Sequence, residues 1–286
     1  MPSTLEPFWS YQLVVAIVLN VGLNALQIGA YAARLAGVTT GRVGTSISLF
    51  NLFVTMSRFA NMFYAPMLGS ISDAAGRAVR NPVLVNAEVM QYSMQMRAII
   101  FSSTAGTLLG VVLLPTFTYV FVRAVGAFER RGSMPHALAR VFDPRVVGDI
   151  LGSIRIPSAN VFSRFSVRDV PARLLVANVL VTGIYAVGVV AAYLASVLRP
   201  EVARTALSAS GLVNGFATIA FALVVDPTSA LIVDKAVKGE RTLHDVKTMV
   251  AYLGLTAVIG TLAAQLILWP AALFIGGAAH LLIVRQ

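Results

Sequence analysis

Three arginines in the N-terminal quarter of the chain are the residues best suited to binding chemistry. Arg34 and Arg42 flank a short turn, and Arg58 lies inside the apolar segment that follows. An arginine near the centre of a lipid-spanning helix costs about 2.5–3.5 kcal/mol on insertion scales, so it is usually buried in a cavity or paired. Because a guanidinium binds phosphate through two parallel hydrogen bonds, we interpret these residues as a site for a phosphate-bearing ligand.

An alternative stays open for Arg58. Its guanidinium could bond backbone carbonyl groups, or extend along the helix to the outer membrane surface, without contacting a ligand. In that case the cost of burying the charge would be offset within the protein, and Arg58 would be structural.

Side-chain amides lie in line with Arg34 on the segment before the turn. Asn20, Asn24 and Gln27 recur with Tyr31 and Arg34 at steps of four, three, four and three residues. At 100° per residue these five positions fall within about 80° of one another. In lipid such a polar stripe must face other helices or a wet cavity, because an unsatisfied amide in hydrocarbon is costly. Interhelical hydrogen bonding and a cavity wall are both possible.

The segment after the turn repeats this pattern. Gly44, Ser48, Asn51, Thr55 and Arg58 share one helical face, and Asn61 follows one turn later. The intervening turn at 36–41 is short, so the two helices must be antiparallel neighbours. We predict that the two stripes form walls of one chamber, with these substrate-binding residues: Arg34, Arg42, Arg58, Asn61, Asn20, Asn24, Gln27, Asn51 and Thr55.

Two carboxylates are candidates for a gate. Asp226 and Asp234 follow the fifth apolar segment and lie at a membrane boundary, at about the depth of Arg34 and Arg42. Pairing between these groups would hold the mouth of the chamber shut. Ordinary capping of a helix end by the aspartates is the alternative.

Composition sets the class of protein. The mean hydropathy is +0.80, 57% of residues are hydrophobic and only 12% are charged, about half the usual charged share of a soluble domain. We predict an all-α polytopic membrane protein, a single integral membrane domain over residues 1–286. About 20 apolar residues cross a bilayer core as a helix, and six segments qualify, at 11–31, 43–68, 98–125, 173–198, 203–225 and 249–269.

Interfacial helices complete the prediction. The loop 128–172 carries seven arginines and an amphipathic segment, so it should lie flat on anionic lipid. A helix starting at Asn81-Pro82 is expected on the outer membrane surface, and Pro115 is expected to kink the third span. At Pro270 we expect a break followed by a short apolar helix at 271–284; a seventh crossing there is the alternative.

Loop charges predict the orientation. With six spans, fourteen loop cations lie on one side and six on the side that carries the termini. Cytoplasmic loops carry the excess of Lys and Arg, so both termini should face outward and Arg34 and Arg42 the cytoplasm. The formal charge of +10 then reflects contact with anionic membrane lipids, and no nucleic-acid partner is expected.

Several chemistries lack their residues. The chain has no cysteine, no GxxxxGK[ST] motif and only three scattered histidines. No pair of carboxylates lies inside a predicted span, as acid–base or metal-assisted catalysis would need. We therefore expect no metal, no cofactor, no catalytic residue and no enzymatic activity.

The stretch 34–68 carries a specific resemblance. The patterns R-x-A-G-V-x-T-G-R at 34–42, S-x-S-L-F-N at 46–51 and S-R-x-x-N-x-F-x-A-P-x-L at 57–68 are similar to the signature of the Amj family. Members of that family are the alternate lipid II flippases that can replace MurJ in bacteria. Asp226-Pro227 followed by Asp234 resembles a second, weaker family pattern.

The resemblance implies a function and a place for it. It implies translocation of lipid II, the undecaprenyl-pyrophosphate-linked GlcNAc-MurNAc-pentapeptide, across the bacterial cytoplasmic membrane for cell wall synthesis and cell shape. From the residues alone, two alternatives stay open. The protein could carry another prenyl-linked or phosphate-bearing lipid, or it could be a non-transport structural protein. Small-residue faces permit either a homo-oligomer or internal packing.

Overall fold

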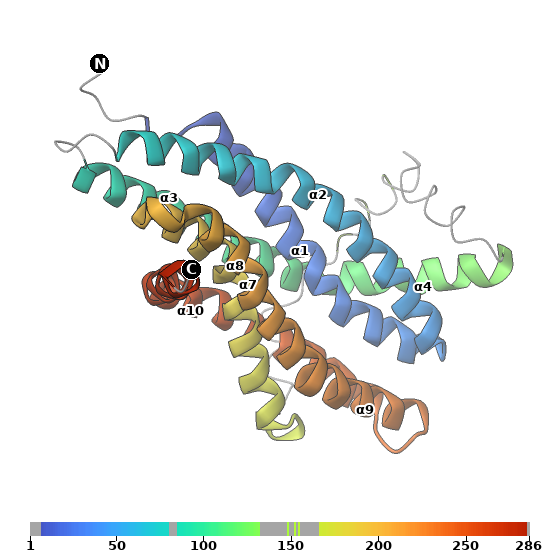
Figure 1. Ribbon diagram of the computed structural model, residues 1–286. Coiled ribbons are helices and arrows are strands. Elements are labelled where there is room, and N and C mark those ends of the chain that lie inside the picture. The colour runs from blue at the N-terminus through green and yellow to red at the C-terminus, as the bar shows by residue number, and fades with distance from the viewer. Residues whose placement is uncertain are drawn as a thin grey trace.

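The fold is a bundle of long helices (Figure 1). In this computed structural model, the structure describes residues 7–79, 85–131 and 166–284, with 148, 152 and 154 as isolated positions. At 52–54, 56–60, 130–131 and 283–284 it describes the backbone alone. Most of the predicted amphipathic loop 128–172 lies outside the described residues.

Eight α-helices are described. They are α1 (Tyr11–Thr40), α2 (Val43–Ala78), α3 (Val85–Val112), α4 (Leu114–Arg131), α7 (Ala172–Leu198), α8 (Ala203–Ala220), α9 (Asp226–Val237) and α10 (Leu243–Val284). Short 3₁₀ helices lie at Val167–Asp169 (η2) and Pro200–Val202 (η3), and a π-helical segment, η4, at Phe221–Val225 joins α8 to α9. This part of the chain contains no strand, so the predicted all-α class is confirmed.

Four continuous helical stretches are long and apolar enough to cross a membrane. They are α1, α7, the stretch from Pro200 to Val237 and α10 up to Leu282. The bent pair α3 and α4 makes a fifth if it is counted as one span. Among the described helices, α2 has the length at 36 residues but does not pass, since polar residues and Arg58 interrupt its apolar sequence. The protein is thus a multi-pass membrane protein, and the crossing expected at 43–68 stays a prediction.

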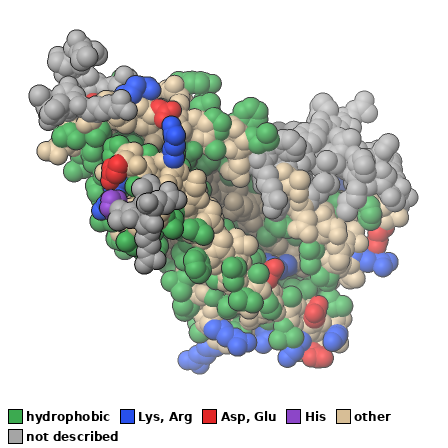
Figure 2. All heavy atoms as spheres, viewed as in Figure 1, with side chains coloured by type: hydrophobic (Ala, Val, Ile, Leu, Met, Phe, Trp, Pro, Cys, Tyr) green, Lys and Arg blue, Asp and Glu red, His purple; other side chains and the backbone are tan. Residues whose placement is uncertain are grey.

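The helices pack as two groups around two apolar cores. Helix α1 packs against α2, α3 and α4, while α10 runs along α7, which also holds α8 (Figure 1). One core joins α1, α2, α3, α7 and α10; the other joins the opposite end of α1 to α4, α9 and the start of α10. Charged side chains lie mainly at the two ends of the face shown in Figure 2, with hydrophobic side chains between them, as expected for a protein embedded in lipid.

Glycines set the distance between α1 and α3. A Cβ atom at Gly106 would lie 2.3 Å from the carbonyl oxygen of Val21, and one at Gly110 would lie 2.7 Å from the Cβ of Ile28. Both are far below van der Waals contact, so only glycine permits this approach. Small residues of α3 thus serve close packing within the bundle.

The first turn is shorter than expected. Helix α1 continues to Thr40, and the chain reverses at Gly41, whose φ of 69° and backbone N–H form the left-handed helix cap. Ser46 then donates to the carbonyl of Ala33 at 2.6 Å, joining the two helices. Arg34 is therefore inside the last turns of a regular helix, and its side chain has a fixed direction.

Helix α3 departs from the expected third span. It begins at Val85 and runs unbroken to Val112, so the expected surface helix is the first part of a long helix. The chain then turns by 60° between α3 and α4. The break at Leu113 precedes Pro115, because proline removes the bond to the carbonyl four residues earlier and fits in the first turn of the new helix.

Two other prolines do not end helices where the sequence suggested. At Asp226-Pro227 the helix shifts to a π turn, in which Asp226 donates its N–H to the carbonyl of Phe221, and then continues as α9. At Pro270 helix α10 continues to Val284, so the predicted break and separate helix at 271–284 are not observed. Neighbouring helices that pack on these segments keep the chain helical where proline alone would not.

Candidate functional site

A large cavity lies between the two groups of helices. Its volume is about 1030 Å³, and residues from α1, α2, α3, α7, α8, η4, α9 and α10 line it. Figure 2 shows a hollow between the part of the molecule formed by α1 and α2 and the part formed by α8 and α9. The stripes predicted on the first two helices therefore do border one space, which we call the chamber.

Arg34 and Asp226 meet in the wall of this chamber. One terminal guanidinium nitrogen, Nη2, binds the Oδ1 atom of Asp226. The Arg34 side chain is only 11% exposed, whereas that of Asp226 is 54% exposed. The other terminal nitrogen, Nη1, is buried and has no hydrogen-bond partner among the described residues. Half of a phosphate-binding fork is thus unused. Burying an unsatisfied charged donor is costly, so this nitrogen suits an anionic ligand.

A hydrogen-bond network behind Arg34 positions it. The guanidinium carbon lies 5.9 Å from the ring centre of Tyr31, within reach of a cation–π contact. The Tyr31 hydroxyl donates to the Oδ1 atom of Asn178 at 3.0 Å. Asn178 is completely buried and donates to the carbonyl of Leu253 and the hydroxyl of Thr256, both at 2.9 Å. Helices α1, α7 and α10 are tied together directly behind the arginine.

The amides of the α1 stripe divide between packing and the chamber. Asn20 is buried and contacts the α3 hydroxyls of Ser102 and Ser103 at 2.9 and 2.7 Å, and Asn24 donates to Asn20. Both line the chamber, but their amide nitrogens donate to protein groups. Gln27 lines the chamber and is exposed. Interhelical bonding thus accounts for the first part of the stripe, and the cavity wall for the part nearer Arg34.

The α2 candidates are also divided. Asn51 and Asn61 line the chamber and are exposed. Thr55 is not in its lining, and its hydroxyl donates to the Asn51 carbonyl within the same helix at 2.9 Å. Arg58 lies on α2 between the two asparagines, and its side chain is outside the described residues. Its role stays a prediction.

Arg42 lies away from the chamber. Its Nε atom binds the Oε1 atom of Glu129 at 2.5 Å, and its side chain is 62% exposed. This pair ties the α1–α2 turn to the end of α4. Asp234 does line the chamber and is exposed, one helical segment beyond Asp226. The structure therefore brings together Arg34, Asp226 and Asp234, and it does not bring Arg42 into the lining.

The sequence reasoning missed a polar face on α7. Asn178, Thr182 and Tyr185 recur at steps of four and three residues, and the last two line the chamber. Tyr185 meets the hydroxyl of Thr218 at 2.7 Å, and beside it the amide oxygen of Asn214 is buried without a partner in the described chain. An asparagine in a span that is otherwise apolar was the available signal, by the same helical spacing used for α1.

This arrangement can bind a molecule with an anionic group beside a polar one. The unused nitrogen of Arg34 supplies a cationic donor, and the amides of Gln27, Asn51 and Asn61 supply donors and acceptors for hydroxyl and amide groups. Among the described residues, no group of three or more His, Cys, Asp or Glu side chains could hold a metal ion.

The fold and the chamber define a multi-pass membrane protein with a polar, arginine-bearing cavity between its helices. The chain belongs to the Amj family, Alternate to MurJ, which matches residues 19–279. It is 37% identical over 254 residues to the lipid II flippase Amj of Bacillus subtilis (strain 168), and the alignment covers 88% of this chain and 91% of that relative. No solved structure matches the chain.

Proposed function

We propose that this protein is a flippase that moves lipid II across the bacterial cytoplasmic membrane for peptidoglycan synthesis. Membership of the Amj family and the similarity to a protein named as a lipid II flippase support this function. A flippase moves its lipid without changing its covalent bonds, so we assign no catalytic residue. The single observation that carries the proposal is the buried, half-paired guanidinium of Arg34 in a polar chamber.

Arg34 is the proposed receptor for the diphosphate. The unpaired Nη1 atom is buried, so the chamber wall must move before a diphosphate oxygen can accept a hydrogen bond from it. A second oxygen of the same group then competes with the carboxylate for Nη2, which gives the bidentate geometry that phosphate favours. Asp226 is the more exposed partner, so it can turn toward water when it is displaced.

This competition makes the ion pair a gate, and Asp226 its moving part. Without substrate, the pair ties α1 to α9 across the chamber. With a diphosphate on Arg34, that tie is released. The π-helical segment directly before Asp226 is a suitable place for the accompanying movement, since π bulges have weaker local hydrogen bonding and are frequent at functional sites. Asp234 also lines the chamber, and it can bind a cationic group whether the Arg34–Asp226 pair is closed or open.

The amides nearer the centre of the chamber would take the sugar and peptide groups. Gln27, Asn51 and Asn61 are exposed in the lining, and each has both a donor and an acceptor. The buried amide oxygen of Asn214 offers one further acceptor. Arg58 lies about four helical turns along α2 from the turn at Gly41, so it would receive the diphosphate from Arg34 deeper in the membrane.

The orientation follows from the loop cations. We propose that both termini face outward and that the end of the chamber with Arg34 and Asp226 faces the cytoplasm. Lipid II would then enter from the leaflet in which its diphosphate is available, with its prenyl tail remaining in lipid.

A reconstituted transport assay tests the proposal. Purified protein in vesicles with lipid II in the inner leaflet should expose it to an added outer reagent faster than protein-free vesicles do. Arg34→Gln should lower the rate by about 10- to 100-fold, since hydrogen bonds to charged groups contribute about 1.5–3 kcal/mol. Arg173→Gln is the matched control, because Arg173 is exposed at the start of α7 and outside the chamber lining.

The same assay separates the alternatives. Equal rates for wild type and Arg34→Gln would remove the anion site. Transport of undecaprenyl phosphate or phospholipid in place of lipid II would identify a flippase of another lipid. No transport of any of these lipids by folded protein would leave a structural membrane protein.

A further inference from the structure

A second polar cavity lies at the other end of α1, α2 and α3. It has a volume of about 290 Å³ and is lined from the start of α1, the last third of α2 and the first part of α3. Its polar members are Ser10, Gln12, Ser70, Arg77, Glu88, Gln91 and Gln95. None of these residues lines the chamber. We call this space the terminal cavity.

The walls of the terminal cavity are polar and close to neutral. Arg77 supplies one cation and Glu88, which is buried, one anion. The amide of Gln95 is held by the carbonyl of Phe8 at 2.9 Å, which fixes the wall on that side. Gln12 and Gln91 add two further amides. Such walls suit hydroxyl and amide groups, whereas one arginine beside one carboxylate offsets little of the negative charge of a diphosphate.

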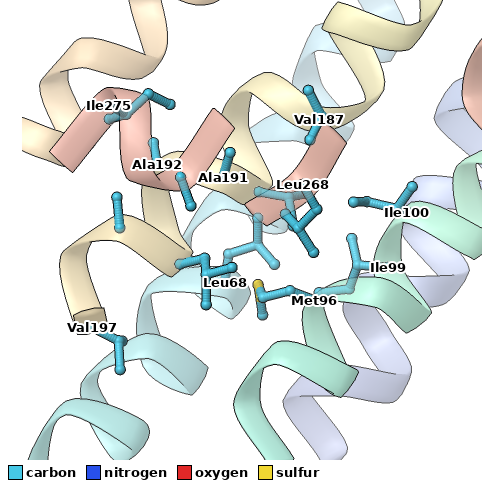
Figure 3. Close-up of a cluster of buried hydrophobic side chains, with 14 of the residues drawn as sticks. Leu68, Met96, Ile99, Ile100, Val187, Ala191, Ala192, Val197, Leu268 and Ile275 are labelled. Atoms are coloured by element: carbon cyan, nitrogen blue, oxygen red, sulfur yellow. The ribbon is translucent and has the colours of Figure 1, made fainter. Parts of the chain in front are cut away.

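A thin apolar layer separates the two cavities. Along α1 the terminal cavity ends at Gln12 and the chamber begins at Asn20, a rise of about 12 Å for eight residues. Between them lie the fully buried side chains of Leu13 on α1, Leu68 on α2, and Met96 and Ile99 on α3. Figure 3 shows Leu68, Met96 and Ile99 directed toward one another. The two polar cavities are thus in line on the same three helices, with an apolar seal between them.

We propose that the terminal cavity is a second binding site, which takes the sugar or peptide part of the substrate headgroup on the far side of the seal. The inference rests on the proposed flippase function and adds a release site to it. At its volume, near the lower end of small-molecule pockets, the cavity holds one sugar ring or a short piece of peptide, not the whole headgroup. Separation of α2 from α1 and α3 at Leu68 would join it to the chamber.

Single cysteines can test the site, because the natural chain has none. Ser70→Cys places a thiol in the terminal cavity. The Ser70 hydroxyl donates to the Met67 carbonyl of its own helix, so the change is mild. Ala30→Cys places a thiol in the chamber. Each full-length variant is reconstituted, and its rate of reaction with a water-soluble maleimide is measured with two probes: the lipid-free GlcNAc-MurNAc-pentapeptide and inorganic pyrophosphate.

We expect the glycopeptide to slow labelling of Ser70→Cys at least threefold, and pyrophosphate to leave it unchanged. Pyrophosphate should slow labelling of Ala30→Cys. Adding Arg77→Gln to Ser70→Cys should abolish the protection, whereas adding Arg204→Gln should not, since Arg204 is an exposed residue outside the cavity lining.

Three outcomes of the protection experiment would overturn the second site. They are no protection of Ser70→Cys by the glycopeptide, protection by pyrophosphate, or protection that depends only on whether the vesicles contain phosphatidylglycerol or phosphatidylcholine. A Ser70→Cys thiol that never reacts would overturn it as well, because a release site must open to water. Lipid II transport by the unmodified protein, measured in the same vesicles, decides the proposed function separately.

Discussion

Arg34 on α1 and Asp226 on α9 are separated by 192 residues in the chain and form an ion pair in the wall of the chamber. The pair is asymmetric, because the arginine is nearly buried and the aspartate is half exposed. One guanidinium nitrogen remains without a partner in the described chain. This geometry leads to predictions about binding, transport and folding that can be checked independently.

Removing the carboxylate should strengthen anion binding. In Asp226→Asn both terminal nitrogens of Arg34 are available to a ligand, which no longer displaces an anion. We expect pyrophosphate to bind about tenfold more tightly, which corresponds to about 1.4 kcal/mol, in calorimetry on the purified protein. Asp245→Asn, at the start of α10 and outside the chamber lining, is the control. Unchanged or weaker binding by Asp226→Asn would show that Asp226 does not compete with the ligand.

Arg58 should be required for transport although its side chain is not described here. Asn51 and Asn61, which lie on either side of it along α2, both line the chamber. Arg58→Ala should fail to support growth of cells depleted of their other lipid II flippase, at normal membrane levels of protein. Arg58→Lys should be partly active, because a point charge replaces a planar fork. Normal growth with alanine would assign Arg58 to a structural role.

Water should reach only part of the α1 stripe. Single cysteines at Gln27 and Asn51 should react with a membrane-impermeant thiol reagent, because both residues are exposed in the chamber. A cysteine at Asn20 should react at least tenfold more slowly, since Asn20 is buried against α3. Equal protection at all three positions would mean that the chamber is dry and that the stripe serves packing throughout.

Close packing of α1 on α3 should be intolerant of a single methyl group. Gly106→Ala would place its Cβ atom 2.3 Å from a backbone oxygen, so we expect a loss of about 1–3 kcal/mol and a clear fall in Tm in detergent. Gly22→Ala is the matched control on α1, since nothing lies within 4 Å of its added Cβ atom. A Tm for Gly106→Ala equal to that of the control would contradict the packing described for these helices.

The network behind Arg34 should affect both stability and binding. Asn178→Leu removes the amide that joins Tyr31 to α10, leaving the Leu253 and Thr256 groups without that partner; we expect about 1–3 kcal/mol of lost stability. Tyr31→Phe removes one hydroxyl only and should cost less. If the network positions Arg34, both variants should also bind pyrophosphate more weakly. Loss of stability with unchanged binding would limit the network to a structural role.

The amino-acid sequence by itself determined the membrane class, the helical fold and the polar stripes of α1 and α2. These follow from hydropathy and from helical spacing, which are local properties of the chain. It also pointed to Asp226 as a partner for an arginine near the end of α1. It could not choose between Arg34 and Arg42, because both flank the same turn and differ only in which way the side chain points once α1 extends to Thr40.

Only the tertiary structure decided how each polar residue is used. Asn20 and Gln27 lie on one stripe, yet close approach at Gly106 buries the first against α3 and leaves the second in the chamber. Pro227 and Pro270 would each end an isolated helix. Packing against neighbouring helices keeps the chain helical at both positions, at the start of α9 and within α10. The physical reason is the same in each case. Propensity and periodicity act between residues a few positions apart, whereas burial and pairing depend on side chains contributed by helices that lie far away in the sequence.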